Sequence, residues 1–131
     1  MHTDRVSTHD RKDTTVVIGI PKEIKNNEFR VGMTPGGARE FVAFGHTVLV
    51  EKAAGEGSSF GDDEYLAAGA ELVESADEVF ARADMIVKVK EPQEVEIARL
   101  RPGQILYTYL HLAPDLAQTQ GLIKSGAVCI A

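Results

Sequence analysis

Short apolar runs alternate with amphipathic segments along most of the chain, and this alternation limits the folds that the sequence can adopt. Runs rich in β-branched and aromatic residues predict buried strands. They lie at 16–20, 47–50, 71–73, 85–89, 104–110 and 127–131. Helical segments are expected between them at 35–45, 63–68, 75–83, 93–100 and 115–124. Strands that alternate with helices predict an α/β fold, with a mostly parallel sheet flanked by helices and right-handed crossovers.

Capping residues fix the starts of two of these helices. Thr34 followed by Pro35 is typical of an N-cap and a first helical residue, and Gly45 is expected to end that helix. Ser75 followed three residues later by Glu78 fits a capping box. Both signals predict helices that begin directly after these positions.

Length and composition exclude several classes of function. The 131 residues suffice for one domain, and the net charge of −6 argues against nucleic acid or an anionic membrane as the main partner. No apolar run is long enough to span a bilayer. Cys129 is the only cysteine, so we expect a buried structural thiol, no intramolecular disulfide and a reducing cytoplasm. Residues 1–15 are polar and predict a disordered extension, in which His2 and His9 are solvated rather than metal ligands.

Three cationic or titratable residues follow predicted strands. Arg30 comes after the strand at 16–20, Lys90 after that at 85–89 and His111 after that at 104–110. The carboxyl ends of parallel strands meet at one edge of a sheet, where open α/β sheets place their ligands. Arg, Lys and His at one edge predict a site for a small carboxylate, because a guanidinium fork matches a carboxylate and His exchanges protons near neutral pH.

The same residues also allow structural interpretations. Arg30 could be a surface arginine that pairs with Glu23 or Glu28, and Glu23 itself is a candidate for supporting the site. Lys90 could be a solvated strand end, and His111 a core histidine bonded to backbone. Lys88 shares a predicted sheet face with Lys90, so the strand period alone does not decide which lysine acts.

A glycine-rich segment after the second predicted strand does not fit a dinucleotide site. Gly55, Gly57 and Gly61 run G-x-G-x-x-x-G rather than G-x-G-x-x-G, and they begin five residues past the strand. No helix follows at once to direct its N-terminus at a pyrophosphate. We therefore predict a flexible loop at 53–61 and no nucleotide site.

A series of motifs, in order along the chain, resembles one enzyme family. The motifs are VIGIPKEIKNNEFRVG at 17–32, TP at 34–35, GH at 45–46, AGEGS at 54–58, AAGA at 67–70, KVKEP at 88–92, GQIL at 103–106, YLHLA at 109–113 and SG at 125–126. In these motifs the chain resembles the N-terminal, substrate-binding domain of alanine dehydrogenases. The transhydrogenase α subunit shares only the PKE, Arg30 and TP features, so it is the weaker resemblance.

The resemblance implies a flavodoxin-like or Rossmann-like substrate domain of an NAD-dependent oxidoreductase that interconverts L-alanine with pyruvate and ammonia. By resemblance, Arg30 grips the substrate carboxylate, Lys90 contacts the carboxylate and the keto oxygen, and His111 is the catalytic acid/base. A further aspartate and every NAD contact belong to a Rossmann domain without counterpart here. The resemblance also implies a cytoplasmic homo-hexamer with a small-molecule substrate.

We therefore expect residues 16–131 to form the substrate-binding domain, with the NAD-binding domain absent from the chain. Because the sequence stops at Ala131 inside an apolar run, we expect a truncated chain that is inactive alone. The alternatives are a stand-alone module that binds small carboxylates, a truncated remnant, and a transhydrogenase α-subunit domain.

Overall fold

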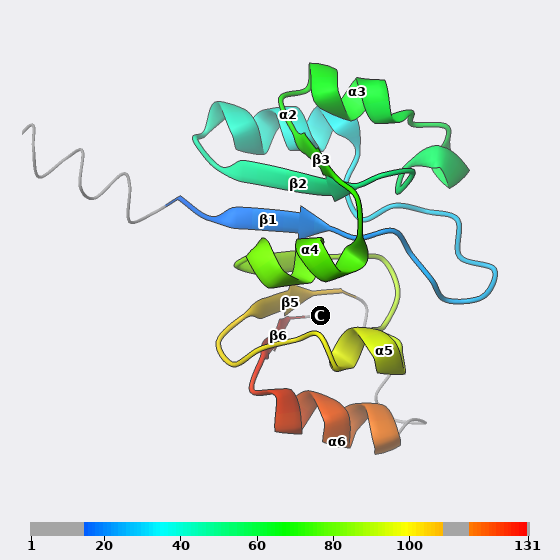
Figure 1. The fold of residues 1–131 in the computed structure, drawn as a ribbon, viewed down its shortest axis with the longest axis vertical. Coiled ribbons are helices and arrows are strands. Elements are labelled where there is room, and N and C mark those ends of the chain that lie inside the picture. Colours follow the sequence, from blue (N-terminus) through cyan, green and yellow to red (C-terminus); the bar gives the residue numbers. More distant parts are fainter. Residues whose placement is uncertain (1–14, 109–115, 131) are drawn as a thin grey trace, which may run out of the picture.

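A computed structural model describes residues 15–108 and 116–130. Strands and helices alternate along these residues, and together they form one sheet with helices packed against it (Figure 1). The strands are β1 (Val17–Ile20), β2 (Thr47–Glu51), β3 (Glu71–Val73), β4 (Met85–Val87), β5 (Ile105–Tyr107) and β6 (Val128–Ile130). The helices are α2 (Pro35–Ala43), the 3₁₀ turn η1 (Glu56–Ser58), α3 (Asp62–Ala67), α4 (Ala76–Arg82), α5 (Glu94–Ile97) and α6 (Leu116–Ser125).

The described strands form a six-stranded sheet in the order β3-β2-β1-β4-β5-β6, and each neighbouring pair is parallel. This finding confirms the predicted α/β class. β1 occupies the centre, since its Ile18 is in register with Val48 of β2 on one side and Met85 of β4 on the other. The chain first builds outward from β1 to β3 and then returns to add β4 on the other side. Open α/β sheets bind ligands at such a switch point, beyond the carboxyl ends of the two central strands.

The side chains of β2 show how the sheet separates two hydrophobic cores. Val48 and Val50 pack on one face, in a core that includes Ala38 of α2 and Tyr65 of α3. Leu49 faces the opposite core, which contains residues of α4 and α6. All three β2 side chains are almost fully buried, as expected for a parallel strand covered on both faces.

The capping signals are confirmed at both helix starts. Thr34 Oγ1 accepts a hydrogen bond from Gly37 N at 3.0 Å, and Pro35 is the first residue of α2. Ser75 Oγ accepts from Glu78 N at 3.2 Å at the start of α4. Gly45 follows α2 with a φ of 93°, a left-handed conformation that only glycine adopts at little cost.

Several predicted boundaries and environments are wrong. The strand expected at 85–89 ends at Val87, and the helix expected at 93–100 is a helical segment from Glu94 to Ile97 only. Cys129 on β6 is half-buried rather than buried, because β6 has a neighbouring strand on one side only among the described residues.

The segment at 53–61 is a packed turn rather than an open loop. A Cβ on Gly57 would lie 2.4 Å from the Phe29 carbonyl oxygen, and one on Gly55 would lie 2.7 Å from that of Phe60. These glycines are therefore required by the close approach of neighbouring backbone. They do not form an open cradle for a phosphate. The predicted extension at 1–15 lies, apart from Thr15, outside the described residues.

Candidate functional site

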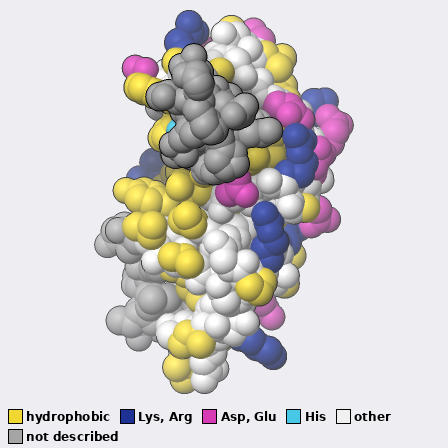
Figure 2. Space-filling model, turned by 90° about the vertical axis from the view of Figure 1, so that its left-hand side faces the viewer, with side chains coloured by type: hydrophobic (Ala, Val, Ile, Leu, Met, Phe, Trp, Pro, Cys, Tyr) yellow, Lys and Arg dark blue, Asp and Glu magenta, His cyan; other side chains and the backbone are white. Residues whose placement is uncertain are grey.

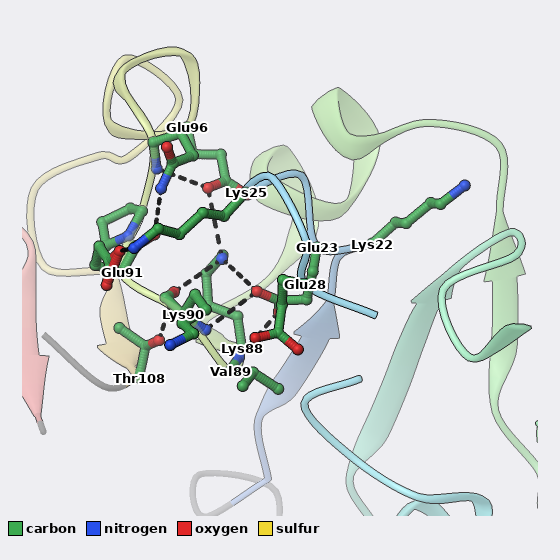
Figure 3. Close-up of polar contacts among 12 residues, drawn as sticks. Lys22, Glu23, Lys25, Glu28, Lys88, Val89, Lys90, Glu91, Glu96 and Thr108 are labelled. Atoms are coloured by element: carbon green, nitrogen blue, oxygen red, sulfur yellow. Dashed lines mark hydrogen bonds and ion pairs between the residues drawn. The ribbon is translucent and has the colours of Figure 1, made fainter. Parts of the chain in front are cut away.

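The candidate site lies beyond the carboxyl ends of β1 and β4. The chain leaving β1 forms the segment 21–33 and the chain leaving β4 forms the segment 88–93, and side chains of the two meet (Figure 3). Figure 2 views the molecule from the other end of the strands, where hydrophobic side chains gather on one half and charges of both signs on the other. The polar contacts described below lie at the carboxyl ends of the strands, which is the end of the sheet that α/β proteins use for ligands.

Glu23 is the centre of these contacts. Its Oε1 accepts hydrogen bonds from Lys90 N at 3.1 Å and from Lys88 Nζ at 2.9 Å, and its Oε2 accepts from Val89 N at 2.9 Å. The side chain is 2% exposed. The Lys88 amide still donates to the Tyr107 carbonyl oxygen of β5 at 3.1 Å, but the next two amides bond to Glu23, so the ladder does not continue past Lys88 (Figure 3).

The two lysines of the KVKEP segment have different environments. Lys88 is buried with a side-chain exposure of 1%, and its Nζ contacts Glu23, Glu96 at 3.5 Å and the Lys90 carbonyl oxygen at 3.0 Å. Lys90 is half-buried, and within the described residues its Nζ makes no hydrogen bond or ion pair. Thr108 Oγ1 donates to the Lys90 carbonyl oxygen at 2.8 Å. Of the two lysines, Lys90 is therefore the one available to a ligand.

Arg30 pairs with Glu28 rather than with Glu23. Its Nε and Nη2 donate to the two oxygens of Glu28 at 2.9 and 2.8 Å, and its backbone N donates to Oε2 at 2.8 Å. The Arg30 side chain is 66% exposed, whereas that of Glu28 is 4% exposed. Within the described residues, Nη1 of Arg30 makes no hydrogen bond. One edge of the guanidinium is thus held by the protein, and the other remains open to a ligand.

The charges around Glu28 shift its ionisation strongly. The pKa of Glu28 is lowered to about 2, chiefly by hydrogen bonds from Arg30 and to a smaller extent by the positive charge of Lys90, against the opposing effect of burial. Glu28 in turn raises the pKa of Arg30. Glu28 thus pairs directly with Arg30, and the positive charge of Lys90 acts on the same carboxylate.

Two further glutamates contact lysines here: Glu91 within the KVKEP segment and Glu96 in α5. Burial raises the pKa of Glu96, although the positive charge of Lys88 opposes this shift. Burial also acts to raise the pKa of Glu91, but its hydrogen bond with Lys25 and the nearby positive charges outweigh burial and lower it. Glu96 pairs with Lys88 and Glu91 pairs with Lys25, so each of these two carboxylates is bound to a lysine.

A hollow of about 430 Å³ opens beside Arg30. It lies between the segment 22–30 and the turn that contains Ala53, Ala54, Glu56 and Gly57. A larger hollow of about 780 Å³ lies between α5 and α6 and is lined by neither Arg30 nor Lys90. The smaller hollow is therefore the one associated with the Arg30 guanidinium, and Lys90 lines neither of the two.

His111, the third predicted site residue, lies outside the described residues. In the described part of the chain, no group of three or more His, Cys, Asp or Glu side chains is arranged to hold a metal ion. Among those residues there is also no helix with the length and apolar character needed to cross a membrane.

Sequence reasoning missed the anchoring roles of Lys88, Glu96 and Thr108. Only Glu96 carried a local signal, since it lies three residues after Gln93 and its Oε1 accepts from Gln93 N at 2.8 Å, as an N-terminal helix cap predicts. The contacts of Lys88 and Thr108 depend on strand neighbours distant in sequence.

Fold and site together define an α/β domain with a hollow beside an arginine at the switch point of its sheet. The sequence pattern of the family described as "Alanine dehydrogenase/PNT, N-terminal domain" matches residues 19–131, and the chain belongs to this family. A curated relative, alanine dehydrogenase of Halomonas elongata, is 55% identical over 114 residues, which cover 87% of this chain and 31% of the relative. Alanine dehydrogenase of Mycobacterium tuberculosis is 54% identical, with the same shares covered.

Solved structures agree with this assignment. An L-alanine dehydrogenase aligns with a TM-score of 0.85 at 48% identity, covering 88% of this chain and 32% of that one. A transhydrogenase from Sinorhizobium meliloti aligns with a TM-score of 0.81 at 30% identity, covering 88% and 33%. The chain spans about a third of the length of the curated relatives that it matches.

Proposed function

We propose that this chain is the substrate-binding part of an L-alanine dehydrogenase, an NAD-dependent oxidoreductase that interconverts L-alanine with pyruvate and ammonia. The observation that carries the proposal is the Arg30 guanidinium, which has one edge bound to Glu28 and lies beside a hollow at the switch point of a domain of this family. A carboxylate is already held there by the guanidinium, so the site has the charge and geometry for a small carboxylate substrate.

Each residue has a chemical role in this proposal. Arg30 binds the substrate carboxylate through its open edge, at Nη1 and the outer hydrogen of Nη2, while Glu28 holds the opposite edge. Lys90 donates to the substrate carbonyl oxygen and stabilises negative charge that develops there. His111 exchanges a proton with the substrate, as its unperturbed pKa allows near neutral pH.

The described residues do not fit NAD. The glycine segment that would have to cradle a pyrophosphate is packed against Phe29 and Phe60, so a nucleotide finds no open backbone there. We propose that NAD is bound by the separate Rossmann domain that the resemblance implies, and no residue role above depends on it. The isolated chain is accordingly expected to bind substrate without turning it over.

The proposal also includes a cytoplasmic location and assembly as a homo-hexamer, as the resemblance to alanine dehydrogenases implies. A transhydrogenase α-subunit domain is the second candidate, and it is less favoured because the solved transhydrogenase is 30% identical where the L-alanine dehydrogenase is 48% identical. A stand-alone carboxylate-binding module is also expected to bind pyruvate, whereas a truncated remnant is expected to bind none.

Calorimetric titration of the purified chain with pyruvate tests the proposal. We expect weak, saturable binding that Arg30→Met and Lys90→Met each abolish. Lys52→Met is the matched control, since Lys52 pairs with the exposed Glu74 outside the site, and it should bind as the parent does. Absence of heat at millimolar pyruvate, or equal binding by all variants, would refute the assignment of the site.

A second assay separates binding from catalysis. The purified chain is mixed with L-alanine and NAD, and absorbance at the NADH band is followed. We expect no steady NADH production, because the described residues do not fit NAD. Sustained turnover by the chain alone would contradict that part of the proposal while leaving the carboxylate site in place.

A further inference from the structure

Side chains, rather than a strand or a helix, hold the backbone at Val89 and Lys90. The Val89 and Lys90 amides donate to Glu23, at 2.9 and 3.1 Å. The Lys90 carbonyl oxygen accepts from Lys88 Nζ at 3.0 Å and from Thr108 Oγ1 at 2.8 Å. The polar groups on both sides of one residue are thus fixed, although this residue belongs to no regular element (Figure 3).

Stability alone is a poor explanation for the Glu23–Lys88 pair. The two side chains are 2% and 1% exposed, and removing both charges from water offsets most of their attraction. An apolar pair of similar volume would stabilise a core at least as well. The buried pair instead fixes a conformation, because its hydrogen bonds can form with only one arrangement of the neighbouring backbone.

The chemistry at Glu23 requires a carboxylate in particular. Three donors converge on its two oxygens: Lys88 Nζ and Lys90 N on Oε1, and Val89 N on Oε2. A carboxylate is an acceptor at both oxygens, whereas the amide of Gln would bring its own donor against one of these groups. Charge also strengthens each of the bonds.

The other end of the segment is tied to the same cluster. Lys88 Nζ lies 3.5 Å from Glu96 Oε1, and this oxygen accepts from Gln93 N at the start of α5. Lys88 therefore links Glu23 from the β1 crossover to the residue that caps α5. The segment between β4 and α5 is anchored at its start and at its end.

We propose that Glu23 and Lys88 are positioning residues that fix the backbone at Lys90, and with it the point from which the Lys90 side chain reaches the substrate. Neither residue touches the substrate. They act through the Lys90 backbone, because Glu23 binds its amide and Lys88 binds its carbonyl oxygen. The part of this inference that concerns substrate rests on the proposed function, and the part that concerns the backbone does not.

Amide hydrogen exchange tests the backbone part without any ligand. In the parent chain, the Val89 and Lys90 amides should be protected, and Glu23→Gln should accelerate their exchange about tenfold or more, the effect of losing hydrogen bonds to a charged acceptor. The amides of Ile18 and Val48 in the core should keep their protection. Glu74→Gln is the matched control, because that carboxylate is 76% exposed, and it should change none of these rates.

Two results would overturn the inference. Unchanged exchange at Val89 and Lys90 in Glu23→Gln would show that the carboxylate does not hold them. Equal acceleration across the core would show that Glu23 supports the fold as a whole. If Glu23→Gln does not fold, Glu23→Asp serves in its place, since it keeps the charge but withdraws both oxygens by one methylene, and the same two amides should exchange faster.

A double-mutant cycle in pyruvate affinity tests the link to Lys90. Glu23→Gln should weaken binding severalfold in the parent chain and add nothing when Lys90 is already Met, because Glu23 acts only through Lys90. Equal losses in both backgrounds would contradict a positioning role. If the parent chain binds no pyruvate, the proposed function fails, while the exchange result still decides whether Glu23 holds the Lys90 backbone.

Discussion

The ion pair between Glu28 and Arg30 makes the stability of this domain depend on pH in a defined direction. The pKa of Glu28 is lowered from 4.5 to about 2 in the folded chain, chiefly by the Arg30 hydrogen bonds. Between these values the folded state binds fewer protons at this carboxyl than the unfolded state does. The stabilisation is therefore complete above about pH 4.5 and is lost as the pH falls towards 2.

The size of the effect follows from the shift. If all of it counted, a shift of this size would correspond to about 3 kcal/mol of stability at neutral pH. Arg30 is 66% exposed, so solvent screens the pair, and we reduce the expected contribution to about 1–2 kcal/mol. Replacing Glu28 by Gln removes the titrating group and should remove this contribution.

Urea unfolding of the parent chain and of Glu28→Gln between pH 7 and pH 3 measures the difference. The variant should be less stable by about 1–2 kcal/mol at pH 7, and more than half of that gap should be gone at pH 3. Other titrating groups cancel in the comparison. Glu74→Gln, at an exposed carboxylate, should show a small and flat difference. A gap for Glu28→Gln that stays constant down to pH 3, or no gap at pH 7, would refute the reasoning.

Three further substitutions test the packing around the site by urea unfolding at pH 7. Tyr65→Phe removes a buried hydroxyl that donates to the Met33 carbonyl oxygen at 2.6 Å, and it should cost about 1–2 kcal/mol; no loss would mean that water replaces the bond. Gly32→Ala places a Cβ 2.5 Å from the Val87 carbonyl oxygen and should cost about 1–3 kcal/mol, unless the backbone shifts freely. Gly36→Ala, with nothing nearer than 3.9 Å in α2, should instead stabilise by about 0.5 kcal/mol, and destabilisation would count against the helix start at Pro35.

The parts of the fold that the sequence predicted depend on short-range signals. Apolar runs with β-branched residues located all the described strands, and the side-chain oxygens of Thr34 and Ser75 located two helix starts. These features are local because a strand needs a period of two and a cap needs three residues. The order of the strands was not predicted, because the crossover rules for parallel sheets fix handedness and not which strands are neighbours.

The ends of elements at the site were not predictable in the same way. The strand expected at 85–89 ends at Val87 because the Val89 and Lys90 amides bond to Glu23, which lies 66 and 67 residues away in the sequence. No local pattern contains this information. Glu23, in the segment that follows β1, provides hydrogen bonds that replace those of a strand, although the apolar run favours a longer strand.

Chain pattern alone therefore determined the α/β class, the parallel sheet and the presence of Arg30 and Lys90 after the two central strands. Only the tertiary structure decided that Lys88 is buried while Lys90 is accessible, and that Glu28 rather than Glu23 holds Arg30. The reason is physical: propensity and periodicity act over a few residues, whereas burial and ion pairing depend on which crossovers meet at the end of the sheet.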